Sequence, residues 1–475
     1  MARPEEITRL SASELRRRIG RREVSPVEVV EACLAQMDHY NGTINAVVTR
    51  NERALDEARR LEQQTARGEA MGLLHGVPVG IKDVTPVADL RTTYGSPLYA
   101  DHVPAEDALV VWRLRAAGAV ILGKTNTPEF AAGGNTFNDV FGYTRNPWNP
   151  ERTAGGSTGG GAAALASGMI ALAEGSDLGG SLRMPASFCG VVGLRPSAGL
   201  VPTVPAAHLW DRLWVTGGMG PTAEDVALFL QATAGPSPDS PVYQPVEGRD
   251  FVAAVQAGLR PGLRLAYCPD VAGIGIDAGL ERVCRKAAFE MTQIGAEVEA
   301  VTLDLSRGRD AFLALRAYEI AAVHSQRLGV VDQLGANLAG NIRAGLRVTT
   351  EALAAAEHTR SQLWLRFRDF FRRHDYLLTP CMAVPPFPVE QNYPETVAGK
   401  TMETYVDWFA PTFVLSLTGL PVGCVPCGLD DEGLPVGLQI VGPPMGEEGV
   451  LALARQIQQA LPIDLPDLSG LSSQA

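Results

Sequence analysis

The sequence has no apolar run that approaches the ~18 residues of a membrane-spanning helix. Its first ten residues, MARPEEITRL, include acidic side chains and lack the apolar core of a secretory signal. From these two absences we expect a cytoplasmic protein that does not use a membrane as a partner.

An excess of positive charge is missing as well. The chain has 41 Lys and Arg residues against 53 Asp and Glu residues, which gives a formal net charge of −12. Phosphate backbones would not attract such a surface. We therefore expect no nucleic-acid partner.

Cysteine is sparse and irregularly spaced. The seven cysteines are scattered and odd in number, which favours reduced thiols over a disulfide framework. Cys424 and Cys427 form a CxxC pattern, but no second cysteine pair or nearby histidine completes a metal site. We expect these two to pack in a strand, and we expect no metal.

Alternating helix and strand signals predict an α/β fold. Helix starts are predicted at Ser11 and Ser25, each with Glu three residues later, and the second helix should end near residues 41 and 42. Further helices are expected at residues 52–67, 109–117, 160–168 and 351–373. Strands are expected at residues 77–81, 119–122, 170–173, 263–267, 298–303, 376–379, 423–426 and 437–441.

Two serines preceded by glycines, Ser157 and Ser181, lie 24 positions apart. Glycine allows a backbone to present a hydroxyl beside several N–H groups, which suits nucleophilic catalysis. Neither serine has a histidine close in sequence, so a lysine at the end of the strand 77–81, Lys82, is the candidate base. Burial would have to lower its pKa from roughly 10.4. Asp83 should face away, because neighbouring strand residues point to opposite faces.

At these residues the chain resembles the amidase signature family. The likeness is carried by LHGVPVGIKD ending at Asp83, by GGSTGGG, and by SDLGGSLRMPASFCGVVGLRPSAGLVP. It extends to ILGKTNTPEF and to TGLPVGCVPCGLDDEGLPVGLQIVGPP, so it spans nearly the whole chain.

The resemblance implies a Ser-cisSer-Lys triad, in which Ser181 is the nucleophile, Ser157 the bridging serine after a cis peptide bond, and Lys82 the base. It implies no metal and no organic cofactor. The oxyanion hole would be formed by the backbone N–H groups of Leu178, Gly179, Gly180 and Ser181. Supporting positions would be Gly156, Thr158 (where the family usually has serine), Asp177 and Arg183.

The resemblance also implies one α/β/α domain over residues 1–475, with a mixed, twisted central sheet covered by helices. Within it we expect N-terminal helices (1–70), a catalytic core (71–235), a variable middle region over the site (236–375) and returning strands with a helix (376–465). Residues 235–250, rich in Pro, Ser and Gly, are a linker candidate inside this domain.

The function implied is hydrolysis of a linear C–N amide bond through an acyl-enzyme. We expect a small-molecule substrate, with apolar or aryl amides preferred over charged ones; esters, anilides and carbamates (urethanes) share the attackable carbonyl. A homodimer is compatible with this interpretation. Candidate pocket residues are Trp210, Trp214, Tyr318 and Trp408, with His324 and Tyr405 in regions that could face the same space.

Three alternatives stay open. The family includes the A-type component of the tRNA-dependent amidotransferase, which works with partner subunits. Residues 155–159 match GxSxG, which would make Ser157 an α/β-hydrolase nucleophile served by a histidine such as His324, His358 or His374. Residues 118–125 match the P-loop expression, although their apolar centre better suits a buried strand.

Overall fold

A continuous eleven-stranded sheet organises the chain. We describe residues 4–471 of a computed structural model. The sheet has the order β1-β3-β2-β8-β10-β9-β16-β17-β13-β11-β12 and mixes parallel and antiparallel neighbours. Its strands are β1 (Val47–Arg50), β2 (Pro78–Lys82), β3 (Val120–Thr125), β8 (Leu172–Asp177), β9 (Val192–Arg195), β10 (Val215–Gly220), β11 (Arg264–Tyr267), β12 (Glu297–Ala300), β13 (Tyr376–Pro380), β16 (Val422–Leu429) and β17 (Pro435–Val441). The predicted single α/β fold with a mixed, helix-covered sheet is confirmed.

The middle of the sheet is closed to solvent on both faces. Every residue of β2, β3, β8, β9, β10, β13 and β17 is buried, whereas β1 and β12 at the two edges are partly exposed. Strands covered by helices on both faces are usually rich in apolar residues, but β8 also contains Glu174, Ser176 and Asp177. Polar side chains in the central strands therefore occupy a dry environment.

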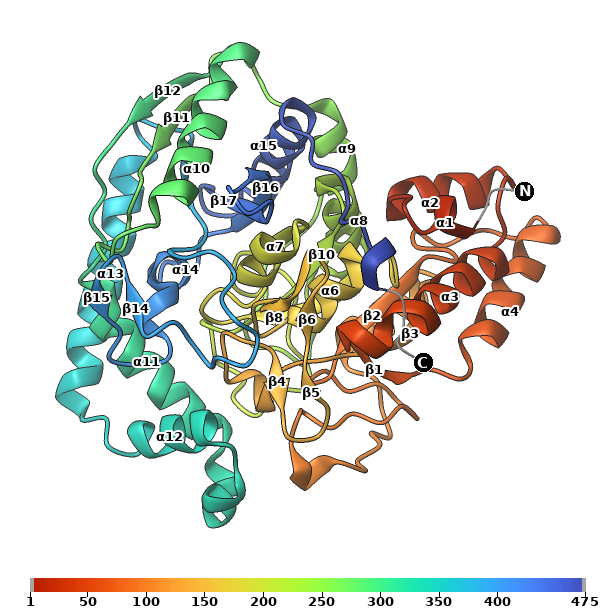
Figure 1. Cartoon of the computed structure of the whole chain (residues 1–475), viewed down its shortest axis with the longest axis horizontal. Coiled ribbons are helices and arrows are strands. Elements are labelled where there is room, and N and C mark those ends of the chain that lie inside the picture. Colours follow the sequence, from red (N-terminus) through yellow and green to blue (C-terminus); the bar gives the residue numbers. More distant parts are fainter. Residues whose placement is uncertain (1–3, 472–475) are drawn as a thin grey trace.

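Helices cover this sheet and form groups at its two ends. The helices are α1 (Pro4–Ile7), α2 (Ala12–Gly20), α3 (Pro26–Ile44), α4 (Ala54–Ala66), α5 (Leu109–Ala116), α6 (Gly159–Ala166), α7 (Arg183–Cys189), α8 (Ala223–Thr233), α9 (Phe251–Ala257), α10 (Ala278–Glu290), α11 (Gly308–Val323), α12 (Ala336–Gly345), α13 (Thr350–Phe370), α14 (Ala410–Ser416) and α15 (Glu447–Ala460). In Figure 1, α1 to α4 lie on one side of the molecule, and α11 to α13 lie on the other. The helices α6 and α7 lie between these groups, beside β8 and β10.

The predicted helix starts are correct. Ser11 caps α2, and Ser25 with Glu28 forms a full capping box on α3. The end of α3 comes later than expected, at Ile44, because Asn45 adopts the left-handed conformation that closes it.

Three other predicted segments lie close to where they were expected. The strand expected at residues 170–173 is β8, which continues to Asp177, so it carries polar residues into the core. The P-loop match falls largely in the buried strand β3, not in a loop. Residues 235–250 contain no helix or strand, as expected for a linker.

Residues 4–471 contain seven free, buried cysteines and no cluster of three or more His, Cys, Asp or Glu arranged to hold a metal ion. Over the same range, no helix has the length and apolar character needed to cross a membrane.

Candidate active site

Strand β2 ends at the centre of the site and delivers Lys82, which is completely buried. Its Nζ lies 2.7 Å from Ser157 Oγ, 2.9 Å from Thr158 Oγ1 and 3.1 Å from Ser176 Oγ. The neighbouring Asp83 turns away, and its carboxylate accepts hydrogen bonds from Thr93. The amine is therefore surrounded by hydroxyls rather than by a carboxylate.

Burial lowers the pKa of Lys82 to about 7 from its ordinary value near 10.5, because a charged amine is poorly solvated there. The negative charges of Glu174 and Asp177 oppose this shift, but they do not cancel it. A substantial fraction of Lys82 is thus neutral at physiological pH, as a general base requires.

The peptide bond between Gly156 and Ser157 is cis, as the family resemblance implied. Gly156 lies against the segment at Gly133 and Gly134, where a Cβ atom would come within 2.9 Å of the Gly134 carbonyl carbon. Only glycine fits this approach without a shift of the backbone. Ser157 is buried, and its hydroxyl is directed to Lys82.

Ser181 stands at the wall of a cavity, in the turn between β8 and α7. It is partly exposed, and its hydroxyl donates no hydrogen bond within residues 4–471. The N–H of Thr158 donates to the Ser181 carbonyl at 3.2 Å, which ties the two serine segments together. The structure thus places Ser181 at the cavity, with the Ser157–Lys82 pair buried.

A buried carboxylate fixes the loop before Ser181. Asp177 accepts hydrogen bonds from the N–H of Gly180 at 2.8 Å and of Leu182 at 3.3 Å. Of the four backbone N–H groups that the family resemblance implied for an oxyanion hole, that of Gly180 is thus already bound to Asp177. The N–H groups of Leu178, Gly179 and Ser181 donate to no acceptor in the described chain.

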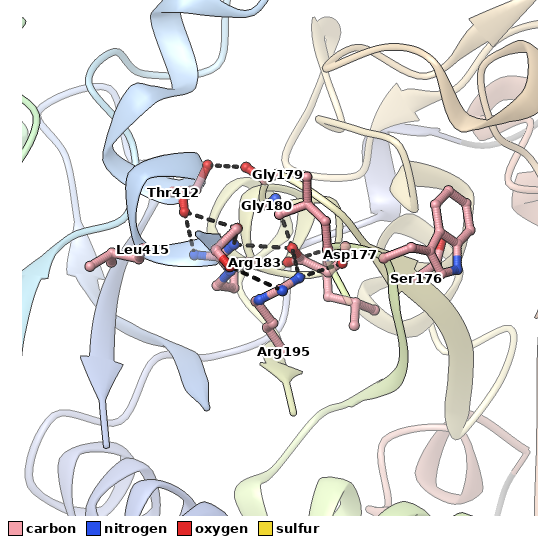
Figure 2. A network of polar contacts seen from close by, with 12 residues as sticks. Ser176, Asp177, Gly179, Gly180, Arg183, Arg195, Thr412 and Leu415 are labelled. Atoms are coloured by element: carbon pink, nitrogen blue, oxygen red, sulfur yellow. Dashed lines mark hydrogen bonds and ion pairs between the residues drawn. The ribbon is translucent and has the colours of Figure 1, made fainter. Parts of the chain in front are cut away.

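Two buried guanidiniums converge on Asp177, as Figure 2 shows. Arg183 donates to both carboxylate oxygens at 3.0 Å and also to the Thr412 carbonyl, and Arg195 lies 3.2 Å from the same carboxylate. Despite burial, these charges hold the pKa of Asp177 near 2, well below its usual range. Arg183 thus ties the Asp177 loop to helix α14.

Gly180 requires glycine for two reasons. Its φ of +132° disfavours any L side chain, and a Cβ atom would lie 2.3 Å from Thr412 Oγ1. Thr412 in turn donates to the Gly179 carbonyl at 2.6 Å (Figure 2). Helix α14 therefore holds the loop in one shape.

The cavity in front of Ser181 has a volume of about 290 Å³ and mostly apolar walls. Of the four predicted pocket residues, Trp214 lines it. The other three lie elsewhere. Trp210 is 65% exposed and lines a separate surface hollow, Tyr318 is 41% exposed, and Trp408 is fully buried among aromatic rings. His324 and Tyr405 do line the cavity.

Two polar residues of the site were missed from the sequence, Glu174 and Ser176. Ser176 contacts the Lys82 amine, while Glu174 accepts the Lys82 backbone N–H at 3.1 Å and the Thr85 hydroxyl at 3.0 Å. Their spacing of two residues, just before Asp177, is a strand pattern that would place both on one face. The predicted strand stopped at residue 173, which concealed this signal.

No histidine within residues 4–471 hydrogen-bonds to Ser157 or Ser181. The ring Nδ1 of His324 has no hydrogen-bond partner among the described residues, His374 contacts Glu299, and His358 is exposed on α13. In addition, the strand before Ser157, Asn149–Thr153, pairs with Arg145–Asn146 and bridges to Pro388, and it lies outside the main sheet. This arrangement lacks the strand and the histidine of a nucleophile elbow.

Comparison with known proteins identifies the family. The family model described as Amidase matches residues 28–451. An acylamidase of Rhodococcus erythropolis is 34% identical over 95% of this chain and 96% of its own length. The A-type component of the glutamyl-tRNA(Gln) amidotransferase of Alkaliphilus metalliredigens (strain QYMF) is 32% identical over 96% of this chain and 97% of its own length. The crystal structure of a bacterial aryl acylamidase of the amidase signature family superposes with a TM-score of 0.89, at 28% identity, covering 96% of this chain and 97% of that one. The chain therefore belongs to the amidase signature family and is an amidase.

Proposed function

We propose that the protein hydrolyses a linear C–N amide bond through a Ser-cisSer-Lys triad formed by Ser181, Ser157 and Lys82. The observation that carries this proposal is the 2.7 Å contact between the buried Lys82 amine and the hydroxyl of Ser157, whose neighbour Thr158 donates its N–H to the carbonyl of the partly exposed Ser181. A neutral amine has two N–H groups and one lone pair. The two N–H groups can therefore donate to Thr158 and Ser176, while the lone pair accepts the hydroxyl proton of Ser157.

In the proposed reaction, Lys82 takes the proton of Ser157 while Ser157 takes that of Ser181. The Ser181 oxygen attacks the carbonyl carbon, and the free N–H groups of Leu178, Gly179 and Ser181 stabilise the oxyanion. The proton returns through Ser157 to the leaving nitrogen, and an acyl-enzyme forms. Water then attacks the acyl group along the same proton route and releases the acid.

The apolar walls of the cavity support an apolar or aryl amide as the substrate. Trp214, Phe312 and Phe409 supply aromatic surface close to the Ser181 loop. The acylamidase and aryl acylamidase relatives agree with this substrate class. Esters, anilides and carbamates present the same carbonyl and fall within the proposal. We further propose that the protein is cytoplasmic and has no nucleic-acid partner. The middle region, residues 236–375, is proposed to determine which substrate is accepted.

A fluorophosphonate probe, which reacts with activated serines, tests this assignment. We expect intact-mass labelling of the wild-type chain, with the modified peptide containing Ser181, and no labelling of Ser181→Ala. Labelling at Ser157 instead would contradict the assignment and favour the GxSxG alternative. Thermal unfolding of each variant serves as the control for folding.

A second candidate is the A-type component of an amidotransferase, because such a component is nearly as similar to this chain as the acylamidase is. The two candidates differ in what the isolated chain can do. Amide hydrolysis by the purified chain alone supports the stand-alone amidase, whereas activity that appears only with partner subunits supports the alternative.

A further inference from the structure

One buried positive charge in the cavity has no carboxylate partner. Arg316, on α11, is 8% exposed and lines the cavity. Its guanidinium donates to Asn341 Oδ1 and to the Tyr405 hydroxyl, each at 2.5 Å, and forms no ion pair within residues 4–471. By contrast, the buried Arg183 and Arg195 share the carboxylate of Asp177. A buried charge without a counter-ion is costly unless a ligand supplies one.

The position of Arg316 relates it to the reaction centre. Phe312, four residues earlier, packs on the Ser181 loop, since a Cβ atom on Gly179 would lie 2.8 Å from its ring. Residues four apart lie on the same helix face, about 6 Å apart along the axis. Ile320 and Val323 continue this cavity-lining face. Arg316 thus lies about one helical turn beyond the reacting serine's loop, with apolar wall on both sides.

The acidic groups of the cavity all have other partners. Glu174 binds the Lys82 N–H and Thr85, and Asp211 accepts the N–H groups of Leu213 and Trp214. Glu319 lies 2.5 Å from His208. None of the three forms an ion pair with Arg316, so its charge remains available to a ligand.

We propose that Arg316 binds a carboxylate of the substrate, and that the preferred substrate is an amide with an apolar body and a carboxylate end. This inference rests on the proposed function and narrows its substrate class, and it replaces the expectation that uncharged amides are preferred over charged ones. A guanidinium has five N–H donors in a planar fork that matches a carboxylate. Between residues 4 and 471 this guanidinium makes two hydrogen bonds, so three of its donors remain.

Binding to Ser181→Ala protein tests the proposal without requiring turnover. Two matched pairs are titrated by calorimetry. The first pair compares glutaryl anilide, which has a carboxylate on the acyl side, with pentanoyl anilide, which has none. The second pair compares 4-(pentanoylamino)benzoate, which has a carboxylate on the amine side, with the same pentanoyl anilide. We expect the carboxylate to tighten binding by about 10- to 100-fold in at least one pair, as a charge-assisted hydrogen bond would. Adding Arg316→Met should abolish that ratio, and Arg316→Lys should restore part of it.

Asn341→Ala is the matched structural control. This substitution removes Asn341, the hydrogen-bond partner that α12 provides, but it keeps the positive charge of Arg316. The affinity ratio between the carboxylate ligand and its neutral partner should therefore be retained. Equal affinities within both pairs, or a ratio that survives Arg316→Met, would overturn the proposal. Wild-type turnover is measured separately. Carboxylate-dependent binding without hydrolysis by the wild-type chain would reject the proposed amidase reaction while leaving the carboxylate site intact.

Discussion

Acid should inactivate this enzyme through protonation of Lys82. Burial lowers the pKa of the amine to about 7, and the neutral form is the proposed base. Activity should therefore rise with pH through 7. Below that value the neutral fraction falls tenfold per pH unit, so at pH 5 about one molecule in 100 retains the base. We expect kcat/KM at pH 5 to be about 100-fold below its plateau.

The assay is hydrolysis of a neutral anilide between pH 5 and 9 at constant ionic strength, with circular dichroism to confirm folding. Because kcat/KM reports the free enzyme, its acid limb gives the pKa of the unliganded site. Glu174→Gln provides a directional test. The negative charge of Glu174 raises the pKa of Lys82, so its removal should move the limb to lower pH.

Glu299→Gln is the control for this shift, because Glu299 lies in the edge strand β12 and contacts His374. Its acid limb should coincide with that of the wild type. A flat profile between pH 5 and 8 in folded protein would refute the assignment of Lys82 as base. A limb that moves to higher pH in Glu174→Gln would refute the electrostatic reasoning.

Three further predictions concern the loop and the cavity. Gly180→Ala should lower the thermal unfolding midpoint and kcat together, at a cost of about 1–3 kcal/mol, because its Cβ would clash with Thr412. Asp177→Asn should cost about 3–5 kcal/mol in urea unfolding, because it leaves two buried guanidiniums without a counter-charge. Trp214→Ala should raise KM for aryl amides in steady-state assays, whereas Trp210→Ala should not, because only Trp214 lines the cavity.

Gly42→Ala is the control for the glycine substitution. Gly42 lies in α3, has no neighbouring atom within 4 Å of a Cβ position, and should gain about 0.5–1 kcal/mol of stability. Gly180→Ala with unchanged stability and kcat would contradict the clash. Asp177→Asn within about 1 kcal/mol of wild type would show that the buried pairs matter little, and equal KM effects in both tryptophan variants would contradict the cavity assignment.

The sequence by itself determined the fold class and the main chemical groups. The helix caps at Ser11 and Ser25, and the alternation of helices and buried strands, follow from local hydrogen bonding and hydrophobic periodicity. Lys82 was placed correctly at a strand end, because a short alternating pattern leads into it. Ser157 and Ser181 could be singled out in the same way, because each is marked by the glycines directly before it in the sequence.

Only the tertiary structure decided which side chains meet. Glu174 and Ser176 join the site because parallel pairing places β8 beside β2, which no local pattern specifies. Trp408 packs in the core and Trp210 faces solvent, and the residue type alone does not distinguish the two. The partners of Arg316, Asn341 and Tyr405, are likewise set by the packing of distant segments, which leaves its guanidinium without an ion pair among the described residues. Burial, and the pKa of Lys82 that depends on it, arises from contacts between distant segments, and it is therefore decided by the folded chain as a whole.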